Sequence, residues 1–177
     1  MKLHIGCGSV IIPGWVNLDI QENPGVDLVD DATVLQTVPD ESCSVIYASH
    51  VLEHFGRNQV SEILNLWCRK LKKGGTLRLA VPDFAKVTEV YQKTHSIENV
   101  LGLVIGGHKN NFDVHGMIFD QKNLTSLLLN TGFYDVRHWD WRNTEHHDKD
   151  DYSQAYFPHM QKSTGTLMSL NLEAVKR

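Results

Sequence analysis

The sequence predicts an α/β fold built on a seven-stranded, mostly parallel sheet. Short apolar segments of strand length alternate with segments whose apolar residues recur every three or four positions, as on one face of a helix. This alternation implies right-handed crossovers and a sheet whose faces are covered by other segments. A length of 177 residues suits one domain with a single core, so we expect one domain over residues 1–177.

Most of the sheet is expected in the first half of the chain. The predicted strands are residues 3–5, 16–20, 26–29, 45–49 and 76–81, and the predicted helices are residues 50–55 and 60–71. The longer helix carries an apolar stripe and is followed by Lys72, Lys73 and Gly74. Cations suit the negative end of a helix, and glycine can take the left-handed conformation that ends one. Pro82 stops the fifth strand.

Helices and a loop follow in the second half. Residues 84–94 and 97–105 have helical patterns, and residues 106–116 form a loop rich in Gly, His and Asn. Asp120 is placed to cap a helix that runs through Asn130 and stops before Gly132.

The last two predicted strands are residues 133–139 and 166–175. The second of them follows a long irregular segment, so we expect an antiparallel C-terminal edge strand. That segment, residues 139–165, is too long for a simple connection and is predicted to be a functional lid or a mobile segment. We expect residues 1–83 to form a cofactor-binding half and residues 84–177 to form the substrate side.

Composition narrows the class of protein. The formal net charge is −4 and there is no run of Lys or Arg, so nucleic acid is an unlikely partner. No apolar run is long enough to span a membrane, and the start of the chain has no signal-peptide pattern. The three cysteines lack paired spacing, so neither a disulfide scaffold nor a zinc knuckle is expected. A reducing, cytoplasmic location fits these features.

The start of the chain carries the most specific signal. Gly6-Cys7-Gly8 follows the first predicted strand, and the second predicted strand contains Asp19 near its end. Glycines let the backbone approach a ligand closely. A carboxylate at the tip of the adjacent strand can accept both hydroxyls of a ribose. The pattern indicates a nucleoside-containing cofactor bound across the strand ends.

Five motifs in order resemble those of a known family. The chain is similar to class I S-adenosylmethionine-dependent methyltransferases, most of all to small predicted methyltransferases of the methyltransferase-domain-11 type. The resemblance is strong over residues 2–83 and looser beyond. It implies a three-layer, Rossmann-like fold and S-adenosylmethionine as cofactor. The motifs are Leu3-His4-Ile5-Gly6-Cys7-Gly8, Asn17-Leu18-Asp19, Asp30-Asp31-Ala32, Ser49-His50-Val51-Leu52-Glu53-His54 and Leu71-Lys72-Lys73-Gly74-Gly75-Thr76-Leu77.

The resemblance also implies cofactor contacts. The Gly6–Gly8 turn would pass beneath the methionine and ribose, and Asp19 would accept the ribose hydroxyls. Asp31, or less favourably Asp30, would receive the adenine amino group. The remaining implied contacts are Cys7 within the turn, Ile20 against adenine, the Ala32 amide to a ring nitrogen, and Ser49 near the methyl group.

Three residues are candidates for catalysis on a small-molecule or glycan-type acceptor. His50 lies just past a strand end, where the methyl group would be presented, and histidine suits the role of general base. His115 and Asp83 are expected to help: the resemblance implies substrate-binding groups in the region of His115, and Asp83 follows a strand end near the crevice. The alternative role for Asp83 is the N-cap of the helix that starts at Phe84. An amine acceptor that is already neutral would need no base, and these residues would then only bind it.

The chain departs from the family pattern in one way that leaves an alternative open. Only residues 9–14 separate the first turn from Trp15, which is too few for the usual first crossover helix. Relatives also carry N-terminal helices over the active site. Later segments or a second subunit, as in a homodimer, would have to cover this side. The alternative function is a catalytically degenerate, methyltransferase-like binding or partner module.

Two rival sites are disfavoured. A dinucleotide fingerprint needs a third glycine where Ile11 stands and an acidic residue later than Asp19. His50, Glu53 and His54 match the H-x-x-E-H pattern of inverted zinc peptidases, but the motif directly follows a strand at the presumed cofactor edge. We therefore expect no metal site and a structural role for Glu53 and His54. His146 and His147 are predicted to be solvated loop residues.

Overall fold

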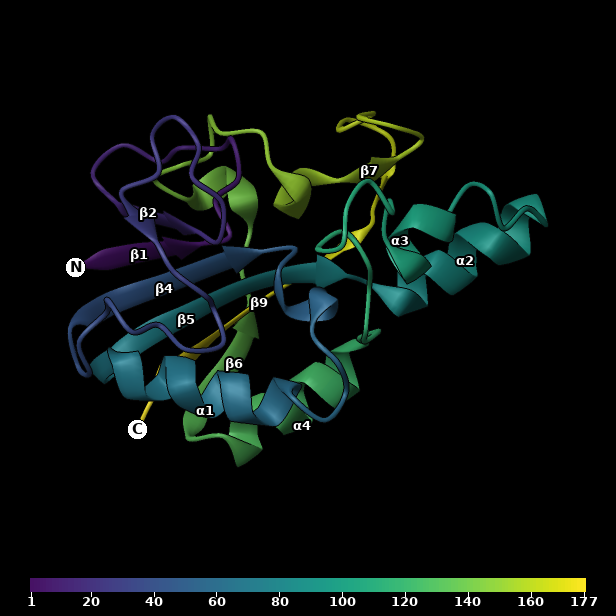
Figure 1. The fold of residues 1–177 in the computed structure, drawn as a ribbon. Coiled ribbons are helices and arrows are strands. Elements are labelled where there is room, and N and C mark those ends of the chain that lie inside the picture. Colours follow the sequence, from purple (N-terminus) through teal and green to yellow (C-terminus); the bar gives the residue numbers. More distant parts are fainter.

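The computed structural model describes residues 1–177 and contains a seven-stranded sheet in the order β3-β2-β1-β4-β5-β9-β6 (Figure 1). Strands β1 to β5 are parallel, which confirms the predicted mostly parallel sheet. The bounds are β1 Lys2–Ile5, β2 Val16–Asp19, β3 Leu28–Val29, β4 Cys43–Ser49, β5 Leu71–Pro82, β6 Phe133–His138 and β9 Ser169–Lys176.

The C-terminal strand β9 is antiparallel, as predicted, but it is not the edge of the sheet. It pairs with β5 on one side and with β6 on the other, so β6 is outermost. The burial of β9 accounts for its position inside the sheet. Leu170 and Leu172 are buried on one face of the strand, and Ser169 and Asn171 are buried on the opposite face. A strand buried on both faces belongs inside a sheet.

One face of the sheet is covered by helices. Helices α1 (Val60–Lys70) and α4 (Gln121–Asn130) lie against it side by side (Figure 1). The apolar stripe of α1 forms as predicted and buries Trp67 completely. The Asp120 carboxylate caps α4 by accepting a hydrogen bond from the Asn123 amide at 2.7 Å. The main hydrophobic core lies between these helices and the sheet.

The other face is covered by irregular chain, so the third layer of the predicted three-layer fold contains no long helix. Residues 6–15 and the segment that begins at Trp139 lie over this face. The only helices in this segment are the short 3-10 helices η2 (Trp141–Asn143) and η3 (Tyr152–Gln154). Tyr47 of β4 packs with Ile12, Trp15 and Trp139 in a second apolar cluster. The predicted lid is thus a packed cover of the sheet.

Asn17 explains how so short a first connection is held. Its side-chain amide donates to the Ile12 and Trp15 carbonyls at 3.2 Å, and its Oδ1 accepts from the Ile12 amide at 2.9 Å. These hydrogen bonds fix the conformation of residues 12–15, which a crossover helix would otherwise do through its own backbone hydrogen bonds.

Three local predictions are wrong in detail. The helix expected over 50–55 is a single 3-10 turn, η1 (Leu52–His54), and the helix expected over 97–105 is reduced to α3 (Leu101–Ile105). Gly74 is left-handed, with φ +73°, but it does not cap α1. The helix ends when Leu71 becomes extended, and residues 72–75 bulge within β5, as the strand partner moves from Leu71 to Thr76.

The remaining elements lie beyond the carboxyl end of β5. Helix α2 (Phe84–Thr94) and α3 project there, near the two-stranded pair β7 (Tyr156–Phe157) and β8 (Thr166–Leu167) (Figure 1). No helix has the length and apolar composition that crossing a bilayer requires.

Candidate active site

The turn after β1 is shaped by its glycines. Gly6 and Gly8 have φ of +65° and +52°, in the left-handed region that side chains disfavour. A Cβ on Gly6 would lie 2.4 Å from Val51 Cγ2, so the turn and the segment after β4 pack too closely for any other residue. Open space surrounds the position of a Cβ on Gly8. The backbone there is accessible to a ligand.

Asp19 ties the end of β2 to this turn. Its Oδ2 accepts a hydrogen bond from the Gly8 amide at 2.8 Å, and its Oδ1 accepts from the Gln21 amide at 2.9 Å. A carboxylate has about four lone-pair sites, so both oxygens can still accept from a ribose. Between them, the buried Cys7 thiol has its pKa raised to about 11 by burial and by the Asp19 charge. The thiol is neutral and fills space in the turn.

The two acidic residues after β3 are not equivalent. Both oxygens of Asp30 are bonded, to the Asp31 amide and to Thr37, and the Thr37 bonds lower its pKa against the opposing effect of burial. Asp31 uses only Oδ1, which accepts from the amide and hydroxyl of Thr33 at 2.7 Å. Asp31 is therefore the better acceptor for an adenine amino group.

The surroundings of Asp31 fit an adenine ring as well. The Ala32 carbonyl accepts from Trp67 Nε1 at 2.8 Å, which anchors this loop to α1. Ile20 is 44% exposed and available for packing. Gly8, Asp19, Ile20 and Asp31 thus offer the groups that an S-adenosyl ligand requires.

His50 marks the carboxyl end of β4. Its backbone is left-handed, with φ +52°, and its amide donates to the Ala80 carbonyl at 2.8 Å. This fixed backbone directs Nδ1 to within 3.1 Å of Glu53 Oε1 and Nε2 to within 3.2 Å of Ser169 Oγ. The neighbouring Ser49 hydroxyl is buried and has no hydrogen-bond partner.

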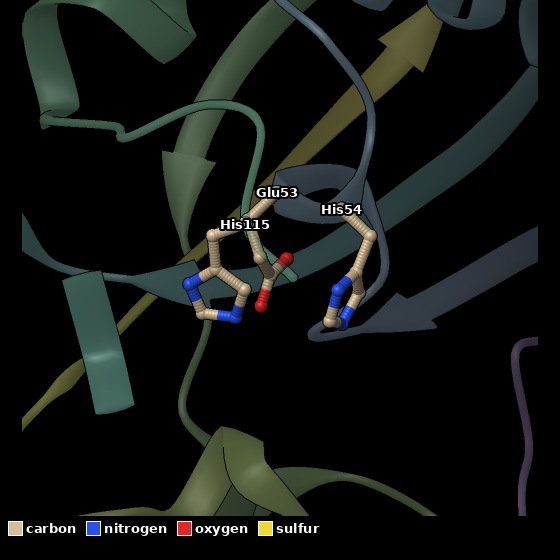
Figure 2. A group of neighbouring side chains, drawn as sticks. All are labelled: Glu53, His54 and His115. Carbon is tan, nitrogen blue, oxygen red and sulfur yellow. The ribbon is translucent and has the colours of Figure 1, made fainter. Parts of the chain in front are cut away.

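Glu53, His54 and His115 form a second group beside His50 (Figure 2). The amides of Gly116 and Met117 donate to the Glu53 carbonyl at 2.8 and 3.1 Å, which holds the His115 segment against η1. The His54 and His115 ring centroids are 5.0 Å apart. Burial lowers the pKa of His115 below its ordinary value.

A cavity of about 310 Å³ connects these side chains. The cavity is lined by His50, Glu53, His54, His115 and Tyr152. The ring centroids of His50 and Tyr152 are 5.3 Å apart. It opens at the carboxyl end of the parallel strands, where ligands of such sheets bind. His50 and His115, both predicted to be catalytic, are thus brought together.

Comparisons with known proteins identify the family that the first half of the chain resembles and the fold of the whole chain. Residues 8–79 match the family model of a methyltransferase domain. Over these residues the chain has the sequence pattern of an S-adenosylmethionine-dependent methyltransferase domain. S-adenosylmethionine is the cofactor of that family, and the groups around Gly8 and Asp19 fit it. No curated protein sequence matches the chain significantly.

Solved methyltransferases share the fold at low sequence identity. One from Archaeoglobus fulgidus is 18% identical, with a TM-score of 0.60, over 99% of this chain and 85% of its own. One from Thermotoga maritima, described as a possible histamine N-methyltransferase, is 16% identical, with a TM-score of 0.62, over 99% and 82%. The 1,6-didemethyltoxoflavin N1-methyltransferase of Burkholderia thailandensis is 13% identical, with a TM-score of 0.57, over 99% and 70%.

Asp83 stands apart from the other predicted catalytic residues of the methyltransferase. It lies after β5 as expected, but its Oδ1 accepts from the Ala85 amide at 2.9 Å and caps α2. It is not among the residues that line the cavity. A catalytic role for Asp83 stays a prediction, and capping is the role that the structure describes.

The sequence missed two features of the methyltransferase site. Tyr152 reaches the cavity from the long segment after β6, and no local motif indicates this. His146 is 2% exposed and packs against Tyr47, so its predicted solvation is wrong. Its neighbour His147 is exposed, as predicted.

Proposed function

We propose that the protein methylates a hydroxyl of a small-molecule or glycan-type acceptor bound beside His50. The observation that carries this proposal is the cavity of about 310 Å³ at the carboxyl end of β4. Ligand pockets span roughly 300–1,000 Å³, so this one suits a single ring or a terminal sugar. The Thermotoga and Burkholderia proteins are named as N-methyltransferases of small molecules, so the fold is compatible with small-molecule acceptors.

The cofactor residues bind and orient. Asp19 would accept hydrogen bonds from the ribose hydroxyls, Asp31 would accept one from the adenine amino group, and Ile20 would pack on the adenine ring. The remaining proposed contacts are the Gly6–Gly8 turn with Cys7, the Ala32 amide and the Ser49 hydroxyl. S-adenosylmethionine, when bound, supplies an electrophilic methyl group on sulfur. Alignment of acceptor and donor removes on the order of 7–11 kcal/mol of the barrier.

His50 acts on the acceptor. Glu53 Oε1 lies 3.1 Å from its Nδ1, so the negative charge of the carboxylate stabilises the imidazolium that forms when His50 takes up a proton. The acceptor hydroxyl would donate a hydrogen bond to His50 Nε2 and would give up its proton to this nitrogen. General base catalysis of this kind contributes about 10²–10⁴-fold.

Ligand-dependent thermal unfolding tests the cofactor site. S-adenosylmethionine or S-adenosylhomocysteine at a hundredfold excess over its Kd stabilises the folded protein by about 2.7 kcal/mol. For a chain of this length we expect a rise in Tm of roughly 5–10 °C. Asp19→Ala should abolish the rise. An equal rise in wild type and variant would show that Asp19 does not bind the ribose.

Turnover tests the acceptor site. Wild type is incubated with methyl-labelled S-adenosylmethionine and a panel of sugars, phenols and amines. We expect transfer to a hydroxyl compound and a loss of about 10²–10⁴-fold in kcat for His50→Ala, with cofactor binding unchanged. Full turnover by His50→Ala would exclude His50 as the base.

The short β1–β2 connection favours one second candidate. Residues 9–14 contain no helix, so less of the protein surrounds the cofactor turn than in the usual fold. A binding or partner module with a methyltransferase-like fold would have this feature too. Cofactor-dependent stabilisation without transfer to any member of the acceptor panel would favour the module.

A further inference from the structure

We propose that Glu53, His54 and His115 bind a divalent transition-metal ion. One ligand atom from each residue lies within 4.8 Å of the other two. Figure 2 shows the Glu53 carboxylate between the two imidazole rings. Metal bonds of about 2.0–2.2 Å place neighbouring ligand atoms roughly 3–3.5 Å apart, so a bound ion would draw these atoms together by roughly 1 Å.

The Glu53 side chain is the observation that points to a cation. Glu53 is 0% exposed, and neither carboxylate oxygen has a hydrogen-bond partner. The contact to His50 Nδ1 at 3.1 Å lacks hydrogen-bond geometry. A buried carboxylate is costly unless it is paired or coordinates a metal. A cation between Glu53 and the two imidazoles provides the missing interaction.

The two histidines are oriented as metal ligands are. His54 Nδ1 lies 3.2 Å from the Val114 carbonyl, and His115 Nδ1 lies 3.2 Å from the Leu103 carbonyl. A carbonyl accepts, so each Nδ1 carries the hydrogen and each Nε2 presents a lone pair. Metal-bound histidines usually donate their other ring nitrogen to such a partner, which fixes the tautomer.

The ligand set selects the class of ion. Two imidazoles and one carboxylate suit Zn²⁺ or Fe²⁺, whereas Mg²⁺ and Ca²⁺ prefer oxygen ligands. The set differs from that of the inverted zinc peptidases. His50 is turned toward Ser169, Glu53 is a ligand rather than a base, and His115 comes from a distant loop.

The same three residues line the cavity with His50, so the open positions of the ion face the acceptor space. A divalent ion there lowers the pKa of a bound hydroxyl and positions it. This role rests on the proposed function, whereas metal binding itself does not.

Equilibrium dialysis and calorimetry of untagged, chelator-stripped protein with Zn²⁺ alone test the site. We expect one ion per chain, at least tenfold weaker binding by His115→Ala and Glu53→Gln, and no comparable binding of Mg²⁺. His108→Ala is the matched control, because His108 is an exposed histidine of the same loop. It should bind Zn²⁺ as wild type does.

Unchanged Zn²⁺ affinity in both His115→Ala and Glu53→Gln would overturn the proposal, as would wild type that binds no Zn²⁺. If a variant fails to fold, the visible spectrum of wild type with Co²⁺ tests whether the protein binds the ion. Aqueous Co²⁺ is octahedral and absorbs weakly, whereas tetrahedral protein-bound Co²⁺ absorbs more strongly. A spectrum identical to that of aqueous Co²⁺ would overturn the site. Cofactor-dependent stabilisation of the metal-free protein is a separate readout, so the site and the proposed function can fail independently.

Discussion

Two groups of histidines in this molecule show opposite uses of the same side chain. His4 and His146 both pack against Tyr47, with ring centroids 5.2 and 4.5 Å from the Tyr47 ring centroid. His54 and His115 instead face a buried carboxylate and line a cavity. His4 and His146 are buried, whereas His54 and His115 are half-buried. The environment of the ring nitrogens distinguishes a core histidine from a candidate ligand.

His4, Tyr47 and His146 form the first group, a buried aromatic column. Trp15 and Trp139 lie edge-on to it, and the Tyr47 hydroxyl donates to Asp151. Burial lowers the pKa of His4 to about 4 and lowers that of His146, so both rings are neutral near pH 7. They behave as apolar surface and fasten the segment after β6 to the sheet.

The largest expected effect is a loss of stability when Trp139, which packs edge-on against the aromatic column, is replaced. Trp139 is 9% exposed, and its Nε1 donates to the Leu79 carbonyl at 2.9 Å. Trp139→Ala should lower the free energy of unfolding by about 3–5 kcal/mol. Urea unfolding measures it, with the less buried Trp141→Ala as control. Equal losses in the two variants would mean that the column contributes no special stability.

Acid should weaken the column next. The unfolded pKa of His4 is 6.5 and the folded pKa is about 4, so the unfolded chain takes up a proton first as the pH falls. The stability is fully present above pH 6.5 and is lost as the pH approaches 4. The loss is about 3 kcal/mol. Urea midpoints between pH 4.5 and 7 should show a flatter dependence in His4→Phe. Identical slopes in wild type and His4→Phe would contradict a neutral, buried His4.

A smaller effect should follow loss of the Tyr47 hydroxyl. Tyr47→Phe keeps the ring and removes the hydrogen bond to Asp151, which should cost about 1.5–3 kcal/mol. Unfolding of the double variant with Asp151→Asn isolates the pair. Strictly additive losses would show that the two groups do not interact.

The smallest effect is expected in the second group. His115→Ala removes a half-buried ring at the cavity wall, so metal-free stability should change by no more than about 0.5 kcal/mol. Zn²⁺ should raise the Tm of wild type and leave that of the variant unchanged. A large loss in metal-free His115→Ala would instead assign His115 to the structural class of His4.

Local patterns predicted much of this structure. The glycine turn, Asp19 and the cap at Asp120 depend on residues close in sequence, and the structure describes each as expected. The bounds of η1 and α3 were less predictable, because short helices depend on tertiary contacts more than on propensity. The cofactor contacts themselves stay predictions.

Features that depend on distant segments could not be predicted. The approach of His115 to Glu53 spans 62 positions and depends on backbone bonds from Gly116 and Met117. His146 and His147 are adjacent and have the same kind of sequence context. His146 is buried because it packs against Trp15 and Tyr47, which come from distant parts of the chain.

The place of β9 has a consequence for biosynthesis. β6 is made before β9, yet it has no partner in the sheet until β9 has paired with β5. Until residues 169–176 leave the ribosome, β5 presents an unpaired edge and β6 has no strand partner. Unpaired strand edges promote aggregation. The nascent chain is therefore most exposed to aggregation between the synthesis of β6 and the pairing of β9.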